Sequence, residues 1–263
     1  MRKIVVIIFL FVSFFSLAQE KELRIPYEEG KTIYGIFSAP TDTMTKQGVV
    51  IISHGFNGTH HFGRDYFKTL NNLGYYVYAF DFPCGSVRSK SDNNTINMSV
   101  SDEKEALKTI VKYFKKQKNV DKKNIVLIGE SQGGLVSALA ASELKKQISH
   151  LILIYPALCI PDNWNERYTN VEDIPEVSEI WGVKLGKKYM MDIRPMKPYE
   201  TIAKYAGLII HGSDDKVVPV DYAKRALKTY RNATLKIIDK AGHGFNPAER
   251  KLSNKYVGEF LAK

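Results

Sequence analysis

The sequence predicts an α/β fold in which a mostly parallel sheet is covered by helices on both faces. The first observation is a series of short, continuously apolar runs, which are typical of strands buried on both faces. The second is that helical patterns separate these runs, as expected of parallel strands joined by crossover helices. The third is the pattern Gly129-x-Ser131-x-Gly133, which follows an apolar run and precedes a helical pattern. The 263 residues show no internal repeat and suit one such domain.

The predicted elements follow one another in a regular order. The turn at 29–31 joins two strand-like segments, 22–28 and 32–39, which predicts an initial hairpin. A helical pattern covers 101–118, and we expect Ser101 to be its N-cap. The other predicted strands cover 49–53, 75–80, 125–128, 151–155, 208–211 and 234–238. The other predicted helices cover 66–73, 132–145, 221–230 and 248–261.

Residues 156–205 interrupt this order because they are too many for a simple connection between two strands. The segment carries two tryptophans, several tyrosines and several prolines, and such an aromatic load is costly to leave in water. Long insertions in compact domains are usually lids or binding loops. We therefore expect an inserted lid at 156–205, rather than a surface excursion without a role.

The first eighteen residues have the layout of a secretory signal peptide. Arg2 and Lys3 precede an apolar run at 4–15, and a small-x-small ending follows at 16–18. The run is shorter than the roughly 20 residues of a membrane span, which argues against a membrane anchor. We expect cleavage after residue 18 and a mature domain over 19–263. That domain is expected to be secreted or periplasmic, without stable membrane association.

The net charge of +10, which removal of Arg2 and Lys3 would lower to +8, raises the possibility of an acidic partner. However, the lysines at 104, 108, 112 and 115 recur at helical spacing, opposite apolar residues. This is the pattern of a solvated helix face, so we expect no nucleic-acid partner. Cys84 and Cys159 each follow a predicted core strand, which favours small pocket-lining residues over a disulfide.

Ser131 lies at the centre of the Gly-x-Ser-x-Gly pattern, between a buried strand and a helix. This context is typical of a nucleophile elbow, a tight turn that exposes the serine Oγ at the carboxyl end of a sheet. A serine needs a general base, usually a histidine that a carboxylate orients. Asp215 and His243 follow the next predicted strands in the order that this elbow requires. We expect Ser131, Asp215 and His243 to form a catalytic triad.

Both partners of the serine have rivals in the sequence. Asp214 adjoins Asp215, but the pattern His-Gly-x-x-Asp-x-x-Val-Pro favours the second aspartate. His54 and His211 each stand before a glycine at a strand end and are expected to organise their loops. The histidine pair at 60–61 has no second cluster with metal-ligand spacing. We expect no metal and no organic cofactor.

An acyl-transfer site also needs two donors for the oxyanion of its tetrahedral intermediate. We expect one donor to be the backbone N–H of Gln132, directly after the serine. The other is expected at Phe56, in the segment Ser-His-Gly-Phe-Asn-Gly that follows the third strand. Glycines on either side of Phe56 would let this backbone approach a substrate closely. The alternative is a plain glycine turn without a catalytic role.

The sequence carries the motifs S-H-G-F-N-G, F-D-F-P-C-G-S, G-E-S-Q-G-G, Y-P-A-L-C-I-P-D, H-G-S-D-D-K-V-V-P and A-G-H-G-F. Together, these motifs resemble those of bacterial α/β-hydrolases of the cinnamoyl (feruloyl) esterase-like group, over nearly all of the chain after residue 18. The resemblance implies the α/β-hydrolase fold, with an eight-stranded, mostly parallel sheet and an inserted lid. It also implies that the lid presents a carboxylate and a tyrosine to a phenolic substrate, and by position these are Asp162 and Tyr189. The segment at 81–86 departs from the glycine-histidine-glycine sequence more usual in the group.

The residues predict a secreted serine carboxylic-ester hydrolase that acts on a small-molecule or oligosaccharide ester through an acyl-enzyme. By resemblance, the favoured substrates are hydroxycinnamic (feruloyl-type) esters from plants. An acetyl or short-chain carbohydrate esterase, a serine peptidase and a non-catalytic carbohydrate-binding module remain as alternatives. The unbroken serine, aspartate and histidine set argues against the binding module. The extra gating domain or acid cluster usual in peptidases of related fold is not evident in the sequence.

Overall fold

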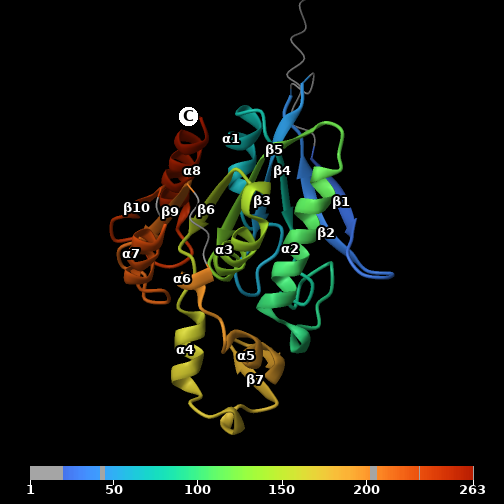
Figure 1. The fold of residues 1–263 in the computed structure, drawn as a ribbon. Coiled ribbons are helices and arrows are strands. Elements are labelled where there is room, and N and C mark those ends of the chain that lie inside the picture. Colours follow the sequence, from blue (N-terminus) through green and yellow to red (C-terminus); the bar gives the residue numbers. More distant parts are fainter. Residues whose placement is uncertain (1–19, 42–44, 202–205, 231, 263) are drawn as a thin grey trace, which may run out of the picture.

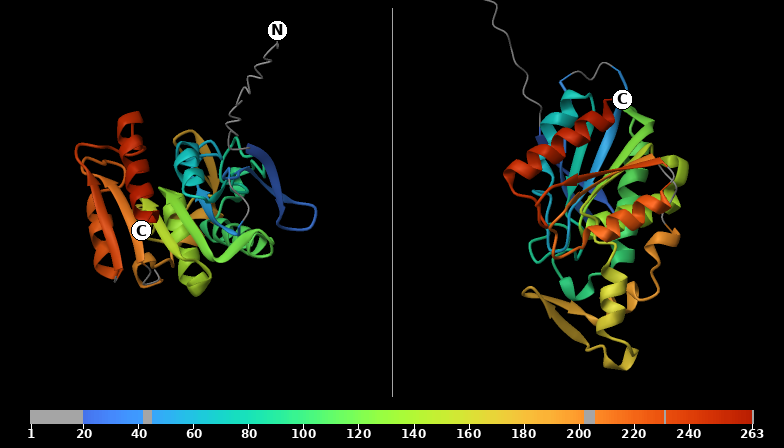
Figure 2. Two further views of the ribbon diagram at one scale, coloured as in Figure 1. Left: turned by 90° about the horizontal axis from the view of Figure 1, so that it is seen from above. Right: turned by 90° about the vertical axis from the view of Figure 1, so that its left-hand side faces the viewer.

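The computed structural model describes residues 20–41, 45–201, 206–230 and 232–262 (Figure 1). The expected signal peptide at 1–18 lies outside the described residues. In the rest of the chain, one large sheet lies between helices on its two faces, as the sequence predicts (Figure 2). Within the described ranges, no helix combines the length and the apolar character needed to span a membrane.

Eight strands form the large sheet in the order β1-β2-β4-β3-β5-β6-β9-β10. β2 runs antiparallel to both β1 and β4, and every other neighbouring pair is parallel. The predicted eight-stranded, mostly parallel sheet is therefore confirmed, together with its initial hairpin. The strands are β1 (Glu20–Pro26), β2 (Thr32–Ser38), β3 (Gln47–Ser53), β4 (Tyr76–Phe80), β5 (Val120–Glu130), β6 (His150–Ile154), β9 (Ala206–Gly212) and β10 (Asn232–Ile238).

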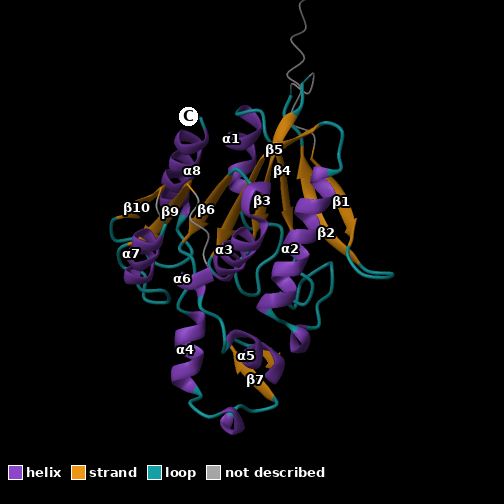
Figure 3. Cartoon of the chain, viewed as in Figure 1, coloured by secondary structure: helices purple, strands orange, loops and turns teal. Residues whose placement is uncertain are grey.

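The central strands are apolar on both faces because helices cover both (Figure 3). In β3, Val49 and Ile51 pack into the core on one face, whereas Val50 and Ile52 pack into the core on the other. Side chains alternate along a strand, so a strand buried on both faces reads as a continuous apolar run. The helices on the first face are α2 (Val100–Lys115), α3 (Gln132–Leu144) and α7 (Val220–Thr229), and those on the second are α1 (Phe67–Asn72) and α8 (Pro247–Leu261).

The N-terminus of α2 differs from the prediction. The helix begins at Val100 and its N-cap is Ser99, whose Oγ accepts a hydrogen bond from the N–H of Asp102 at 3.2 Å. Ser101 lies inside the helix, and its N–H donates to the Asp192 carboxylate at 2.8 Å. The prediction of Ser101 as N-cap was wrong because a distant side chain satisfies this N–H, which local spacing does not show.

The insertion expected at 156–205 projects past the end of the large sheet, where Figure 1 shows it below the strands. Its two short strands pair antiparallel and are joined by Trp181 and Gly182, which both have positive φ values, 48° and 77°. Such a two-residue turn suits a tight hairpin. Residues 202–205 lie outside the described residues. The insertion contains α4 (Ile160–Arg167), β7 (Val177–Ile180), β8 (Val183–Gly186), α5 (Lys187–Ile193) and α6 (Pro198–Thr201).

The last helix offers a test of helix capping. The Asn246 side chain accepts from the N–H groups of Ala248 and Glu249, and the Glu249 carboxylate accepts from the Asn246 N–H. Asn246→Ala should lower the free energy of unfolding by about 1 kcal/mol, because two helical N–H groups lose their acceptor. Asn93→Ala is the control, since this exposed side chain bonds no other described residue. Urea unfolding should show a change below about 0.5 kcal/mol for the control. Equal stability of the two variants would contradict the contribution of the cap.

Candidate active site

The turn between β5 and α3 holds Ser131 in an unusual backbone conformation, with φ at 50° and ψ at −120°. A Cβ atom at Gly129 would lie 2.3 Å from the carbonyl oxygen of Gly133. A Cβ atom at Gly133 would lie 2.3 Å from the carbonyl oxygen of His54. Only glycine fits at both positions. The sequence pattern is therefore a packing requirement of the turn that presents the Ser131 Oγ.

The three residues predicted as a triad meet at the edge of the sheet. His243 Nε2 lies 2.9 Å from Ser131 Oγ, and His243 Nδ1 lies 2.8 Å from Asp215 Oδ2. The three residues follow β5, β9 and β10, and the carboxyl ends of these parallel strands lie at one edge. With Nδ1–H donating to the carboxylate, Nε2 is the ring nitrogen that accepts from the serine hydroxyl.

The structure distinguishes the two adjacent aspartates. The side chain of Asp215 is buried and contacts the histidine. The side chain of Asp214 is 60% exposed and forms an ion pair with Lys216. The geometry therefore agrees with the choice of Asp215 from the sequence.

Hydrogen bonds keep the buried carboxylate of Asp215 ionised. Its Oδ1 accepts from the N–H groups of Val217 and Val218, at 2.9 and 2.8 Å. Its Oδ2 lies 3.3 Å from His211 Nε2, in addition to its contact with His243. Burial favours the neutral acid, but hydrogen bonds from both histidines and from the backbone outweigh it and hold the pKa of this carboxyl below its usual range. His211 Nε2 also lies 2.8 Å from the Val218 carbonyl oxygen, so this histidine organises the loop.

The backbone N–H groups of Phe56 and Gln132, the two predicted oxyanion donors, have no acceptor among the described residues. Both residues line the same pocket as Ser131. The loop before Phe56 approaches the serine closely, since a Cβ atom at Gly55 would lie 3.0 Å from the Ser131 Cβ. Unbonded N–H groups beside a nucleophile are what an oxyanion hole requires.

His54 holds the Phe56 loop in place. Its Nδ1 lies 2.7 Å from the Gly55 carbonyl oxygen, and its Nε2 accepts from the Phe82 N–H at 3.0 Å. Burial lowers the pKa of His54 to about 4, so the ring is neutral at pH 7 and Nε2 can accept. This histidine therefore organises its loop, as the sequence predicts.

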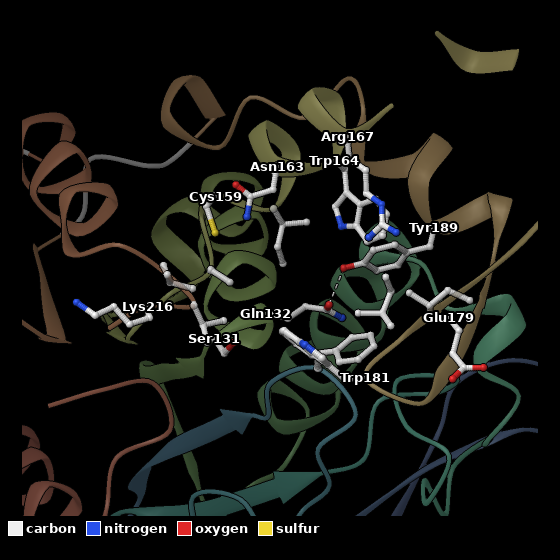
Figure 4. Close-up of a pocket in the computed structure, with 17 residues that line it drawn as sticks. Ser131, Gln132, Cys159, Asn163, Trp164, Arg167, Glu179, Trp181, Tyr189 and Lys216 are labelled. Atoms are coloured by element: carbon white, nitrogen blue, oxygen red, sulfur yellow. Dashed lines mark hydrogen bonds between the residues drawn. The ribbon is translucent and has the colours of Figure 1, made fainter. Parts of the chain in front are cut away.

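A cavity of about 540 Å³ lies between Ser131 and the insertion (Figure 4). Four aromatic side chains line it: Phe56, Trp164, Trp181 and Tyr189. The exposed ring of Trp181 meets that of Phe56 edge-on, with the ring centroids 5.8 Å apart. A cavity of this size with aromatic walls suits a flat organic group. Its charged lining residues are Arg167, Glu179 and Lys216.

The two residues implied to bind substrate differ in position. Tyr189 lines the cavity, and its hydroxyl donates to Gln132 Oε1 at 2.8 Å. Asp162 does not line it, and its carboxylate lies 3.6 Å from the Arg225 guanidinium of α7. The substrate-binding role of Asp162 stays a prediction, and α4 presents another of its faces to the cavity. That face consists of residues 160, 163, 164 and 167, which recur at helical spacing.

Some features of the site were not evident from the sequence. Glu103 of α2 is buried and contacts the Gln132 side chain, yet no local motif marks it. Both cysteines are free, and Cys159 lines this cavity whereas Cys84 does not. In the part of the chain that the structure describes, no group of three histidine, cysteine or acidic residues is placed to hold a metal ion.

Comparison with known proteins identifies the family. Residues 45–194 match the family model Hydrolase_4, described as serine aminopeptidase, S33. A structure of Est1E from Butyrivibrio proteoclasticus with ferulic acid bound is 26% identical, with a TM-score of 0.82, and the match covers 92% of this chain and 100% of that one.

Two further matches involve esterases. An esterase structure from Pyrococcus furiosus is 23% identical, with a TM-score of 0.65, covers 93% of this chain and 92% of that one, and shows likeness of fold. A Mycoplasma pneumoniae protein described as "Putative esterase/lipase 2" is 24% identical over an alignment of 251 residues, and the match covers 80% of this chain and 88% of that protein. Since the family match spans more than half of the sequence, the chain belongs to the Hydrolase_4 family of α/β-hydrolases and is a serine ester hydrolase.

Proposed function

We propose that this protein is a secreted carboxylic-ester hydrolase that releases hydroxycinnamic acids, such as ferulic acid, from plant-derived esters. The observation that carries the reaction type is the 2.9 Å contact between Ser131 Oγ and His243 Nε2, with Asp215 behind the histidine. The aromatic cavity next to Ser131 supports the choice of acyl group. The similarity to Est1E with ferulic acid bound supports the same choice.

In the proposed mechanism, His243 takes the hydroxyl proton of Ser131 while Oγ attacks the ester carbonyl carbon. The N–H groups of Phe56 and Gln132 stabilise the resulting oxyanion. His243 then gives its proton to the leaving alcohol, and the acyl-enzyme forms. A water molecule deprotonated by His243 attacks this acyl group, which releases the acid and restores Ser131. Throughout, Asp215 orients the imidazole and stabilises its protonated form.

The cavity favours a flat aromatic acyl group over an acetyl group. Trp164 and Tyr189 meet edge-to-face, with ring centroids 6.1 Å apart, and form a continuous aromatic wall. An acetyl group would leave most of the 540 Å³ cavity unfilled and would gain little from this wall. A hydroxycinnamoyl group would bury apolar area against it at about 25 cal/mol per Å².

The two neighbouring aspartates provide a matched test of the triad. Asp215→Asn should lower kcat for a nitrophenyl ester by roughly 10⁴-fold, because the amide cannot hold the histidine in the reactive tautomer. Asp214→Asn should change kcat by less than about twofold, since among the described residues this exposed side chain pairs only with Lys216. Ser131→Ala serves as the reference for loss of the nucleophile. A larger effect at position 214 than at 215 would refute this assignment.

A substrate panel tests the acyl specificity. The wild-type protein should hydrolyse methyl ferulate with a higher kcat/KM than it shows for acetylated xylan. Trp164→Ala should lower kcat/KM for methyl ferulate by about tenfold, because an aromatic contact contributes about 0.5–1.5 kcal/mol. The same variant should hydrolyse nitrophenyl acetate within about twofold of the wild-type rate, because a small acyl group gains little from that wall. A protein that cleaves acetylated xylan but leaves methyl ferulate intact would reject the feruloyl proposal in favour of the short-chain esterase.

A serine aminopeptidase is the second candidate, because the matching family model carries that description. Glu179 lines the cavity and has the charge needed to bind a substrate ammonium group. Aminoacyl arylamides in the same panel distinguish the two functions. Arylamide cleavage that exceeds ester cleavage, and that Glu179→Gln abolishes, would replace the esterase proposal.

The proposal of secretion depends on residues 1–18, which are basic, then apolar, then small. Full-length protein expressed in a bacterial host should reach the periplasm or the medium with Gln19 as its first residue. Amino-terminal sequencing of each fraction measures this outcome. Deletion of the apolar run at 4–15 is the control and should leave the protein in the cytoplasm. Cytoplasmic wild-type protein with residues 2–18 still present would argue against export.

A further inference from the structure

The side chain of Gln132 is held from two sides. Its Nε2 lies 3.1 and 2.9 Å from the two carboxyl oxygens of Glu103 on α2. Its Oε1 accepts a hydrogen bond from the Tyr189 hydroxyl, at 2.8 Å, which Figure 4 shows as a dashed line. Gln132 is only 2% exposed, so these contacts are shielded from water. Both ends of one amide are therefore held by elements outside the nucleophile turn.

Glu103 is an unexpected residue at its position in α2. It is 1% exposed, and no cation of the described chain forms an ion pair with it. Burial raises the pKa of Glu103 to about 8, and the nearby carboxylates of Asp192 and Asp102 act in the same direction. The side chain is thus mostly neutral at pH 7 and adds little negative charge near the proposed oxyanion hole. A leucine would fill this position without the cost of burying a carboxyl group, but it could not accept from the Gln132 amide.

The two partners of Gln132 are themselves tied together. Asp192, on the same helix α5 as Tyr189, accepts from the Ser99 hydroxyl at 2.9 Å and from the Ser101 N–H at 2.8 Å. These contacts join α5 to the start of α2, one turn from Glu103. A continuous set of hydrogen bonds therefore links the insertion, α2 and the residue after the nucleophile.

We propose that Glu103 and Tyr189 are positioning residues that keep the Gln132 backbone N–H aligned with the oxyanion. Holding the Gln132 side chain restricts the rotation of its peptide group, and correct placement of the insertion thereby becomes a condition for catalysis. The inference rests on the proposed function, since it takes the Gln132 N–H as an oxyanion donor. It also means that the Tyr189 hydroxyl positions the Gln132 backbone N–H, through the Gln132 side chain, rather than binding the phenol of a substrate.

The test compares four variants on nitrophenyl acetate. Glu103→Leu and Tyr189→Phe should each lower kcat by about tenfold or more, with KM changed by less than about twofold, because an oxyanion donor acts mainly in the transition state. Glu103→Gln should stay within about threefold of the wild type, since its amide oxygen can still accept from Gln132. Glu105→Gln is the matched control on the same helix and should match the wild type, since Glu105 is exposed and pairs with Lys108.

A transition-state analogue gives a second readout. A trifluoromethyl ketone adds to the serine and forms an oxyanion, so its inhibition constant should rise by about the same factor as kcat falls. Thermal unfolding checks that each variant is folded. If Glu103→Leu does not fold, the result for Tyr189→Phe decides the test. Wild-type kcat in the folded variants, or losses confined to KM, would overturn the positioning role while leaving the esterase intact. A wild-type protein that neither cleaves esters nor reacts with a fluorophosphonate at Ser131 would instead overturn the proposed function.

Discussion

Close packing of the backbone around Ser131 is the constraint on which the rest of the site depends. β5 passes into α3 within one residue, and nearby carbonyl oxygens leave no space for a Cβ atom at Gly129 or Gly133. The strained φ of Ser131 persists because the strand and the helix on either side are buried and cannot shift. The same turn points the Oγ out of the sheet and leaves the N–H of Gln132 without an acceptor in the described part of the chain. The proposed nucleophile and one proposed oxyanion donor are thus products of a single turn.

Because the central strands are parallel, loops at one edge of the sheet form the rest of the site. β3, β9 and β10 end at the same edge as β5, so residues far apart in the chain can meet there. Buried histidines hold two of these loops. His54 bonds within the loop after β3 and to the loop after β4, and His211 bonds across the loop after β9. Neither histidine needs to react with a substrate, yet each holds a group that the proposed mechanism uses.

The sequence predicted the strands and the meeting of the triad residues because their signals are local: an apolar run followed by a short motif. Features decided by distant partners were not predictable. The N-cap of α2 is Ser99 and not Ser101, because Asp192 of the insertion accepts a hydrogen bond from the Ser101 N–H. Asp162 faces Arg225 because of the way α4 is rotated about its axis. The position of a residue in a sequence motif does not reveal this rotation. Glu103 lies in a helix that the sequence correctly predicts to be amphipathic. The periodicity of a helix predicts which positions are buried, but it does not predict that Gln132 is the partner of the buried Glu103 side chain.

The insertion makes two kinds of contact: hydrogen bonds, which depend strongly on direction, and contacts with ring surfaces, which depend on it less. Tyr189 and Asp192 make hydrogen bonds to the body of the protein, and such bonds require particular distances and angles. Trp164 and Trp181 instead offer ring surfaces to the cavity, and contact with a ring surface tolerates changes in the group that covers it. Directional contacts are suited to aligning the oxyanion hole identically for every substrate. Ring contacts are suited to accepting a range of flat acyl groups, so one insertion can align the chemistry strictly while selecting the acyl group only by its shape.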